Sequence, residues 1–156
     1  MTTSNRNRIM DGTADIITTA LVAAFGAQCA CVRGFTDEQP ENTLPENTPR
    51  AWLWELDATT IDDDSQPYGW PIRELRFQLI GVVRMTSATA GDPMETQAGP
   101  VQAVLDDMEA VFDVLLTTTV VAGLAPSFIP DGPIVANAGD AEGWIVYPLR
   151  VRYPRV

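Results

Sequence analysis

Carboxylates come closer than any other side chains in this sequence to a catalytic or metal-binding pattern. Three are consecutive, Asp62, Asp63 and Asp64, and four more follow at helical spacing: Asp106, Asp107, Glu109 and Asp113. The first group lacks the alternating oxygen ligands, the glycine and the closing glutamate of a calcium loop, so we predict a solvated loop that faces solvent or a channel. A general acid needs a pKa raised by burial or by a close like charge. The second group lies on the polar side of a predicted helix, so we expect it to face solvent or a channel as well.

The other groups that catalyse reactions or bind metals are scarce. The chain contains no histidine, the residue best suited to proton transfer near neutral pH and the commonest metal ligand. Cys29 and Cys31 are the two cysteines, and no further ligands accompany them. In a strand they would lie about 6.5 to 7 Å apart, near or beyond disulfide geometry. We therefore predict two buried thiols, no cofactor, no metal and no enzymatic activity.

One alternative remains open, a small-ligand-binding or enzymatic α+β domain. Its pocket would be lined by Trp52, Trp54, Tyr68, Trp70 and Trp144, with Asp57 or Glu55 as a carboxylate. Aromatic residues in strands more often belong to a core or an interface, and no nucleophile and base accompany these. A solution monomer that binds a specific small ligand would favour this alternative.

The charge balance is strongly acidic. The 156 residues include 21 Asp and Glu and 10 basic residues, all arginine, for a net charge of −11. Such a balance argues against general binding to DNA phosphates, although a local arginine patch could still contact an acidic neighbour. A GC-rich genome explains the absence of lysine better than a high-salt environment does.

The length and composition predict one globular domain over residues 1–156. Asp11 and Asp15 interrupt the N-terminal apolar positions, which are periodic, so we expect no signal peptide. No run reaches the ~18 apolar residues of a membrane span. We expect a soluble protein, intracellular when made.

Hydrophobic periodicity places the elements. Residues 1–10 are polar and predict an extended arm, followed by a helix over 13–25 capped by Asp11 or Thr13 and ended by Gly26. A strand over 28–35 and a loop over 36–49 come next.

The middle of the chain predicts a hairpin and a second helix. Strands over 50–59 and 72–86 flank a turn region rich in proline and glycine, and the second strand alternates apolar and polar residues. A helix then begins with Pro100 in its first turn and continues to Leu116.

The C-terminal part predicts a closing hairpin. Residues 125–133 read as a loop, 134–136 as a short strand and 144–153 as the last strand, whose odd-numbered residues Ile145 to Tyr153 face the core. Pro148 cannot donate a ladder hydrogen bond, so this strand is predicted at a sheet edge. The expected fold class is α+β, an antiparallel or mixed sheet with two helices packed on one face.

This layout resembles that of the tail terminator, or tail-completion, proteins of long-tailed bacteriophages and related viruses. The similarity covers nearly the whole chain and rests on length, layout and hydrophobic pattern. Its segments are the helix ADIITTALVAAF leading into CACVRGF, the hairpin around RAWLWEL and LRFQLIGVV, the helix VQAVLDDMEAVFDVLL, and the strand GWIVYPLRVRYPRV.

The resemblance implies a structural virion protein of the tail or neck, assembled in the host cytoplasm. It would form a hexameric ring on the head-proximal end of the tail tube, stop tube growth and contact the head connector. The partners would be its own copies, the tail-tube protein and connector or neck proteins, with genomic DNA passing unbound along the acidic channel. Another neck component, such as a head-closure or adaptor protein, is the alternative.

Arginines are the candidate contacts between subunits, because a planar guanidinium pairs well with carboxylates. The candidates are Arg76, Arg84, Arg150, Arg152 and Arg155. The open alternative is that they pair with carboxylates across the same sheet.

Overall fold

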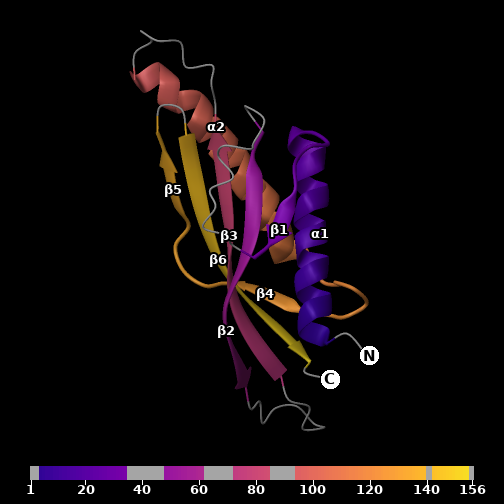
Figure 1. Cartoon of the computed structure of the whole chain (residues 1–156). Coiled ribbons are helices and arrows are strands. Elements are labelled where there is room, and N and C mark those ends of the chain that lie inside the picture. The colour runs from indigo at the N-terminus through magenta and orange to yellow at the C-terminus, as the bar shows by residue number, and fades with distance from the viewer. Residues whose placement is uncertain (1–3, 35–47, 62–71, 85–93, 140–141, 155–156) are drawn as a thin grey trace.

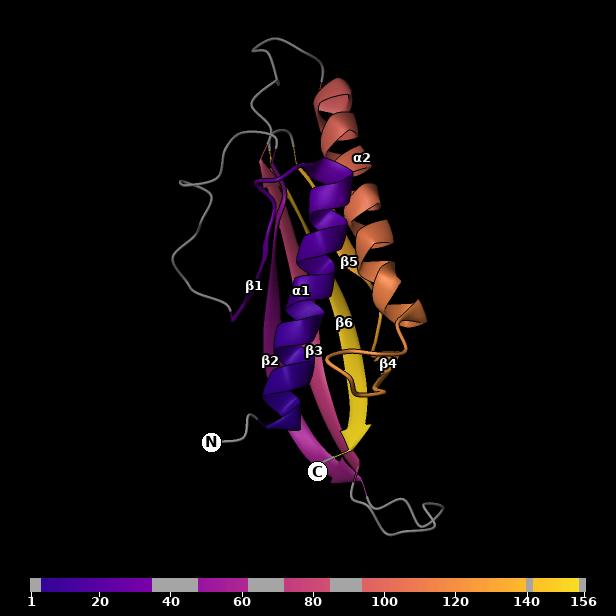
Figure 2. The same ribbon diagram turned by 90° about the vertical axis from the view of Figure 1, so that its right-hand side faces the viewer.

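A single mixed sheet with two helices on one of its faces forms the protein. The computed structural model describes residues 4–34, 48–61, 72–84, 94–139 and 142–154. Its elements in chain order are α1 (Asn5–Phe25), β1 (Cys31–Arg33), β2 (Arg50–Ile61), β3 (Ile72–Arg84), α2 (Met94–Phe112), the 3₁₀ helix η2 (Asp113–Thr117), β4 (Ser127–Pro130), β5 (Val135–Ala138) and β6 (Glu142–Pro154). The strand order is β1-β2-β3-β6-β4, and β5 also pairs with β6. Only β1 and β2 run parallel among these pairs. The predicted α+β class is confirmed (Figures 1 and 2).

Helix α1 begins earlier than the sequence pattern predicts. Ser4 is its N-cap, and the Ser4 hydroxyl accepts a hydrogen bond of 3.2 Å from the backbone N–H of Asn7. The predicted extended arm over residues 1–10 is therefore wrong from Asn5 onward, and residues 1–3 lie outside the described part. Burial explains the longer helix, because Ile9 and Met10 are fully buried and extend the apolar stripe toward the N-terminus. Gly26 ends the helix as predicted, at a φ of 118°.

Helix α2 also starts before its predicted first residue. It begins at Met94, so Pro100 lies in its second turn, where proline cannot supply the N–H that would bond the carbonyl of Thr96. At the other end the chain tightens into η2, consistent with the β-branched residues that follow. The predicted apolar stripe is confirmed at its buried positions, Val101, Leu105, Met108, Phe112 and Leu115.

Strand β6 lies inside the sheet, which corrects the prediction of an edge strand. It pairs with β3 along one side and with β4 and β5 along the other. The Pro148 carbonyl accepts a hydrogen bond from the backbone N–H of Asp131, at 3.1 Å. The N–H and C=O groups of one strand residue point to the same side of the strand. The side on which Pro148 lacks an N–H donor is therefore the side that faces the gap between β4 and β5. The proline therefore divides the outer neighbour into two short strands, and β4 lies where a loop was predicted.

The buried face of β3 and β6 matches the predicted alternation. Leu75, Phe77, Leu79 and Val83 are fully buried, and the odd-numbered residues of β6 from Ile145 to Tyr153 are at most 3% exposed. Met85, predicted to continue this pattern, lies outside the described residues. Cys29 and Cys31 are buried free thiols, as predicted. Burial raises the pKa of both, that of Cys31 to about 12.

Glycines let α2 approach the sheet closely. A Cβ atom at Gly81 of β3 would overlap the Cε atom of Met108 and would lie 2.9 Å from Cγ2 of Ile145. Gly143 of β6 lies in the same way beneath Val101 and Leu105. The absence of a side chain at these two positions sets the distance between α2 and the strands.

Gly81→Ala should therefore lower the free energy of unfolding by about 1–3 kcal/mol, the cost typical of overpacking a core. Chemical denaturation of the variant and the parent measures the loss. In a Met108→Leu background, which removes the overlapping terminal methyl group, the same substitution should cost less. An equal loss in both backgrounds would contradict the role given to this contact.

Candidate functional site

The sheet face opposite the helices is the candidate functional site, and we call it the open face. No described helix or strand packs on it. Strand pairing arranges its side chains in rows: Trp52 with Ile80, Val146 and Val135; Trp54 with Gln78 and Pro148; and Arg76 with Arg150 and Ile129. The first rows are mostly apolar and the last is charged, so the open face has an apolar half and a charged half.

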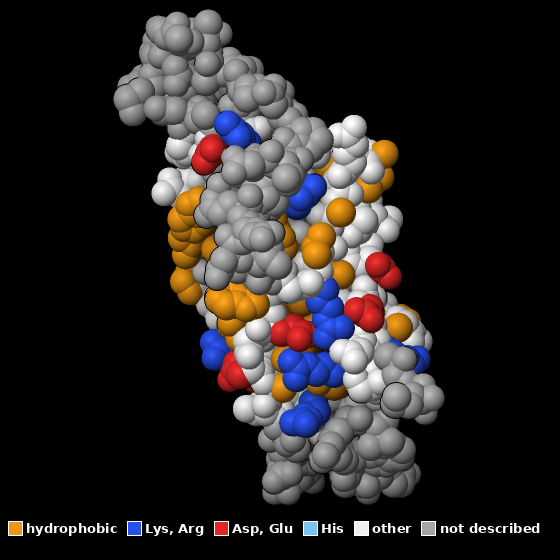
Figure 3. All heavy atoms as spheres, in the orientation of Figure 1, with side chains coloured by type: hydrophobic (Ala, Val, Ile, Leu, Met, Phe, Trp, Pro, Cys, Tyr) orange, Lys and Arg blue, Asp and Glu red, His pale blue; other side chains and the backbone are white. Residues whose placement is uncertain are grey.

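The apolar half exposes large side chains. Trp54 is 42% exposed, Trp144 38% and Val135 48%. Figure 3 shows hydrophobic side chains along the margin of the molecule that faces away from α1. Exposed aromatic and aliphatic residues gathered on one face are typical of an interaction surface.

The charged half is a network of arginines and carboxylates. Asp131 lies 2.8 Å from Nε of Arg76 and 3.2 Å from Nε of Arg150. Glu74 is shared in the same way: its carboxylate lies 2.7 Å from Nε of Arg152 and 3.5 Å from Nη1 of Arg150. Each of these two carboxylates therefore forms ion pairs with two arginines. The network ties the segment after β4 to the centre of the sheet.

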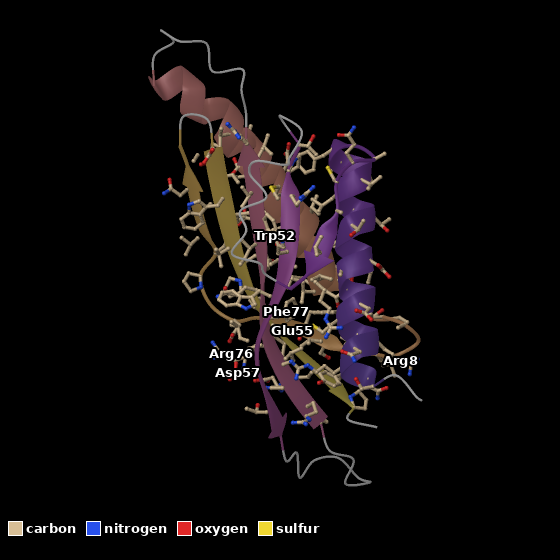
Figure 4. All side chains as sticks on the ribbon, in the orientation of Figure 1. Arg8, Trp52, Glu55, Asp57, Arg76 and Phe77 are labelled. Carbon is tan, nitrogen blue, oxygen red and sulfur yellow. The ribbon has the colours of Figure 1, made fainter. Side chains whose placement is uncertain are left out.

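Arg76 has a second acidic neighbour besides Asp131. Its Nη1 atom lies 3.5 Å from Asp57 of β2, and Figure 4 shows Arg76 and Asp57 together on the side away from α1. The hydrogen bond and the charge of Asp131, followed by the charge of Asp57, hold the pKa of Arg76 above its ordinary value. A register shift between Glu55 and Ala58 places Asp57 here.

The structure thus places three of the predicted arginines, Arg76, Arg150 and Arg152, in one cluster. Arg84 lies further along β3, 3.8 Å from Glu142, and Arg155 lies outside the described residues. Pairing within the same sheet, which the sequence left as an alternative, is what the structure shows for these four described arginines.

The predicted acidic residues of the second helix do not form one cluster with the arginines. Asp106, Asp107 and Asp113 are exposed and Glu109 is half-buried, all on α2 or η2. Asp113 accepts a hydrogen bond of 2.5 Å from the hydroxyl of Tyr147. Burial, and then this bond, raise the pKa of Tyr147.

The three consecutive aspartates cannot be placed relative to this site. Asp62, Asp63 and Asp64 all lie in the segment between β2 and β3 that falls outside the described residues. Their predicted position, in a loop that faces solvent or a channel, therefore stays a prediction.

Of the five aromatic residues of the alternative pocket, Trp52, Trp54 and Trp144 lie on the open face, so this alternative stays a prediction. Trp52 is buried, Trp144 lies two strands away from β2, and Tyr68 and Trp70 lie outside the described residues. A hollow of ≈ 480 Å³ is lined by Arg33, Gly34, Trp54 and Glu55.

The carboxylate of Glu55 is occupied by structural contacts. Its Oε1 atom accepts from Arg33 at 2.6 Å and its Oε2 atom from Arg6 at 3.2 Å. Arg33 also reaches Asp11 at 3.0 Å and Asn7 at 2.9 Å. These bonds attach α1 to β1 and β2, on the opposite side of the sheet from the open face.

Two further properties concern the described residues alone. No group of three or more cysteine or acidic residues there is placed to hold a metal ion. None of the helices in that part of the chain is long and apolar enough to cross a membrane.

Comparison with known proteins leaves the family open. No family model matches the chain, and no curated protein matches it. One matching solved structure, whose name describes no function, is 18% identical and has a TM-score of 0.48, with 96% of this chain and 95% of that chain covered. A similarity at that level supports no functional conclusion.

Asp131 is the functional-site residue that sequence reasoning missed. It lies in a segment predicted as a loop, 55 residues from Arg76 in the chain. The only local signal is the turn sequence Pro130-Asp131-Gly132-Pro133, which indicates a bend but no partner.

Asp131→Asn should lower the melting temperature by about 2–4 °C, the shift that follows a loss of ~1 kcal/mol in a chain of this size. The matched control is Glu142→Gln, which removes an exposed pair at 3.8 Å and should change the melting temperature by less than about 1 °C. Equal effects of the two substitutions in a calorimetric scan would contradict the anchoring role of Asp131.

The raised pKa of Tyr147 predicts that the folded protein loses stability at high pH. Because the folded protein raises its pKa, the folded state holds the proton above pH ~10, where the unfolded tyrosine releases it. The contribution is complete below pH ~10 and falls as the pH rises further. Tyr147→Phe should cost about 1 kcal/mol at neutral pH, and its stability should fall less between pH ~9 and ~11, as denaturant titrations would show. Tyr153, whose pKa burial also raises, remains in both proteins.

Proposed function

We propose that the protein is a structural virion protein that forms a ring, hexameric, at the head-proximal end of a tail tube. In this role it ends tube polymerisation and joins the tail to the head connector. Its partners are further copies of itself, the tail-tube protein and connector or neck proteins. Genomic DNA passes through the ring without specific binding. The protein works in the virion and assembles in the host cytoplasm.

The open face is the observation that carries this proposal. It combines exposed apolar side chains, Trp54, Trp144 and Val135, with a neighbouring arginine network. Aromatic residues and arginine are the types enriched in protein interfaces. A surface of this composition on a small α+β domain suits a protein that works by contact with other proteins.

The charge distribution supports the same role. The whole chain has a net charge of −11, which disfavours binding to DNA phosphates. From Met94 to Thr117 the chain carries acidic residues and no basic residue. A chain with this balance can build a ring through which DNA moves without adhering.

The proposal is tested by mixing the purified protein with the tail-tube protein encoded by the same genome. We expect the protein to cap one end of each tube and to stop its growth, as negative-stain images and tube-length distributions would show. Mass measurement of the capped ends gives the number of copies. Failure to bind the tube under any condition rejects the proposal, and binding to a head connector without capping favours the head-closure or adaptor alternative.

A further inference from the structure

We infer that the open face of one copy docks against the outer side of α2 and η2 of a second copy of this chain. This inference rests on the proposed function, because it names the two surfaces that would join neighbouring subunits. We call the second surface the acidic side; its described residues are Asp106, Asp107, Glu109, Asp113 and Leu116.

Charge complementarity carries the inference. Among the described residues of the open face, arginines outnumber carboxylates. The arginines are Arg50, Arg76, Arg84, Arg150 and Arg152, and the carboxylates are Asp57, Glu74, Asp131 and Glu142. The acidic side has no basic residue at all. In a chain of net charge −11, the open face is therefore a surface with a local excess of arginines, and the acidic side of a second copy complements it.

The internal ion pairs leave donors for such a contact. A guanidinium carries five N–H donors, and Arg76 and Arg152 keep nearly half of their side chains exposed. Two shared carboxylates do not use all the donors of three arginines.

Apolar surface is present on both sides of the contact. The open face exposes Trp144 and Val135, and the acidic side ends in Leu116, 43% exposed, with Val120 following at 62%. Burial of these side chains would add to the electrostatic attraction. Carboxylates beside exposed aliphatic groups complement a face that is half apolar and half arginine-rich.

The positions of the two surfaces determine what their contact builds. Figure 2 shows α2 and α1 in front of the sheet, so the open face and the acidic side lie on opposite sides of the molecule. A contact between two different surfaces is heterologous. Such a contact repeats from copy to copy and closes into a ring when the rotation allows it.

The test uses one variant for each surface. Asp107→Arg reverses an exposed charge on the acidic side, and Val135→Glu adds a charge to the apolar half of the open face. The matched controls are Asp15→Arg and Val22→Glu, which make the same changes at exposed positions of α1. Thermal unfolding confirms that all four variants fold. Sedimentation measures self-association, and the tube end serves as the assembly site if the free parent protein is a monomer.

We expect each surface variant to be monomeric, both controls to assemble like the parent, and a mixture of the two surface variants to form a one-to-one dimer. The mixture contains one intact open face and one intact acidic side, so it can make a single contact. Surface variants that still form rings overturn the inference, and so does a mixture that stays monomeric under conditions in which the parent self-associates. If both variants form normal rings that still cap tubes, the docking surfaces are rejected and the proposed function stands. If the parent self-associates but does not bind the tube, the proposed function is rejected and the docking surfaces stand.

Discussion

The pairing of β3 with β6 is the interaction on which the rest of the structure depends. The two strands match over thirteen residues each, from Ile72 opposite Pro154 to Arg84 opposite Glu142. Both alternate strictly, so a slip of one residue would expose Phe77 and Leu149 and bury the arginines. The register therefore fixes at once which face the helices cover and which side chains remain outside. The composition of the open face is a direct consequence of this one pairing.

Much of the fold could be predicted because its strongest elements satisfy local rules. The alternation of β3 and of β6 and the stripe of α2 each appear within a single stretch of sequence. The start of α1 could not be predicted so easily, because Asn5 to Arg8 are polar and the serine cap is a single residue. Ile9 and Met10 were the available signal, since they continue the stripe toward the N-terminus.

The interior position of β6 and the network on the open face were harder to predict for a physical reason. Pro148 forbids one hydrogen bond, but the sequence does not say on which side of the strand the bond is missing. Its missing donor faces the break between β4 and β5, so a residue typical of edges lies in an interior strand. Asp131 sits at that same break. Its pairing with Arg76 and Arg150 depends on the strand order, which no local pattern contains.

The cluster of arginines in an acidic chain has a structural cause that also shapes the surface. The side chains of Arg76, Arg150 and Arg152 remain 31–49% exposed, so these charged pairs escape part of the desolvation cost of a fully buried pair. Sharing of Asp131 and Glu74 holds Arg76, Arg150 and Arg152 in fixed positions on rigid strands. Arginines held in this way lose less conformational freedom when a partner binds than free side chains would. The network that anchors the segment after β4 therefore also presents a preorganised set of donors beside exposed apolar side chains.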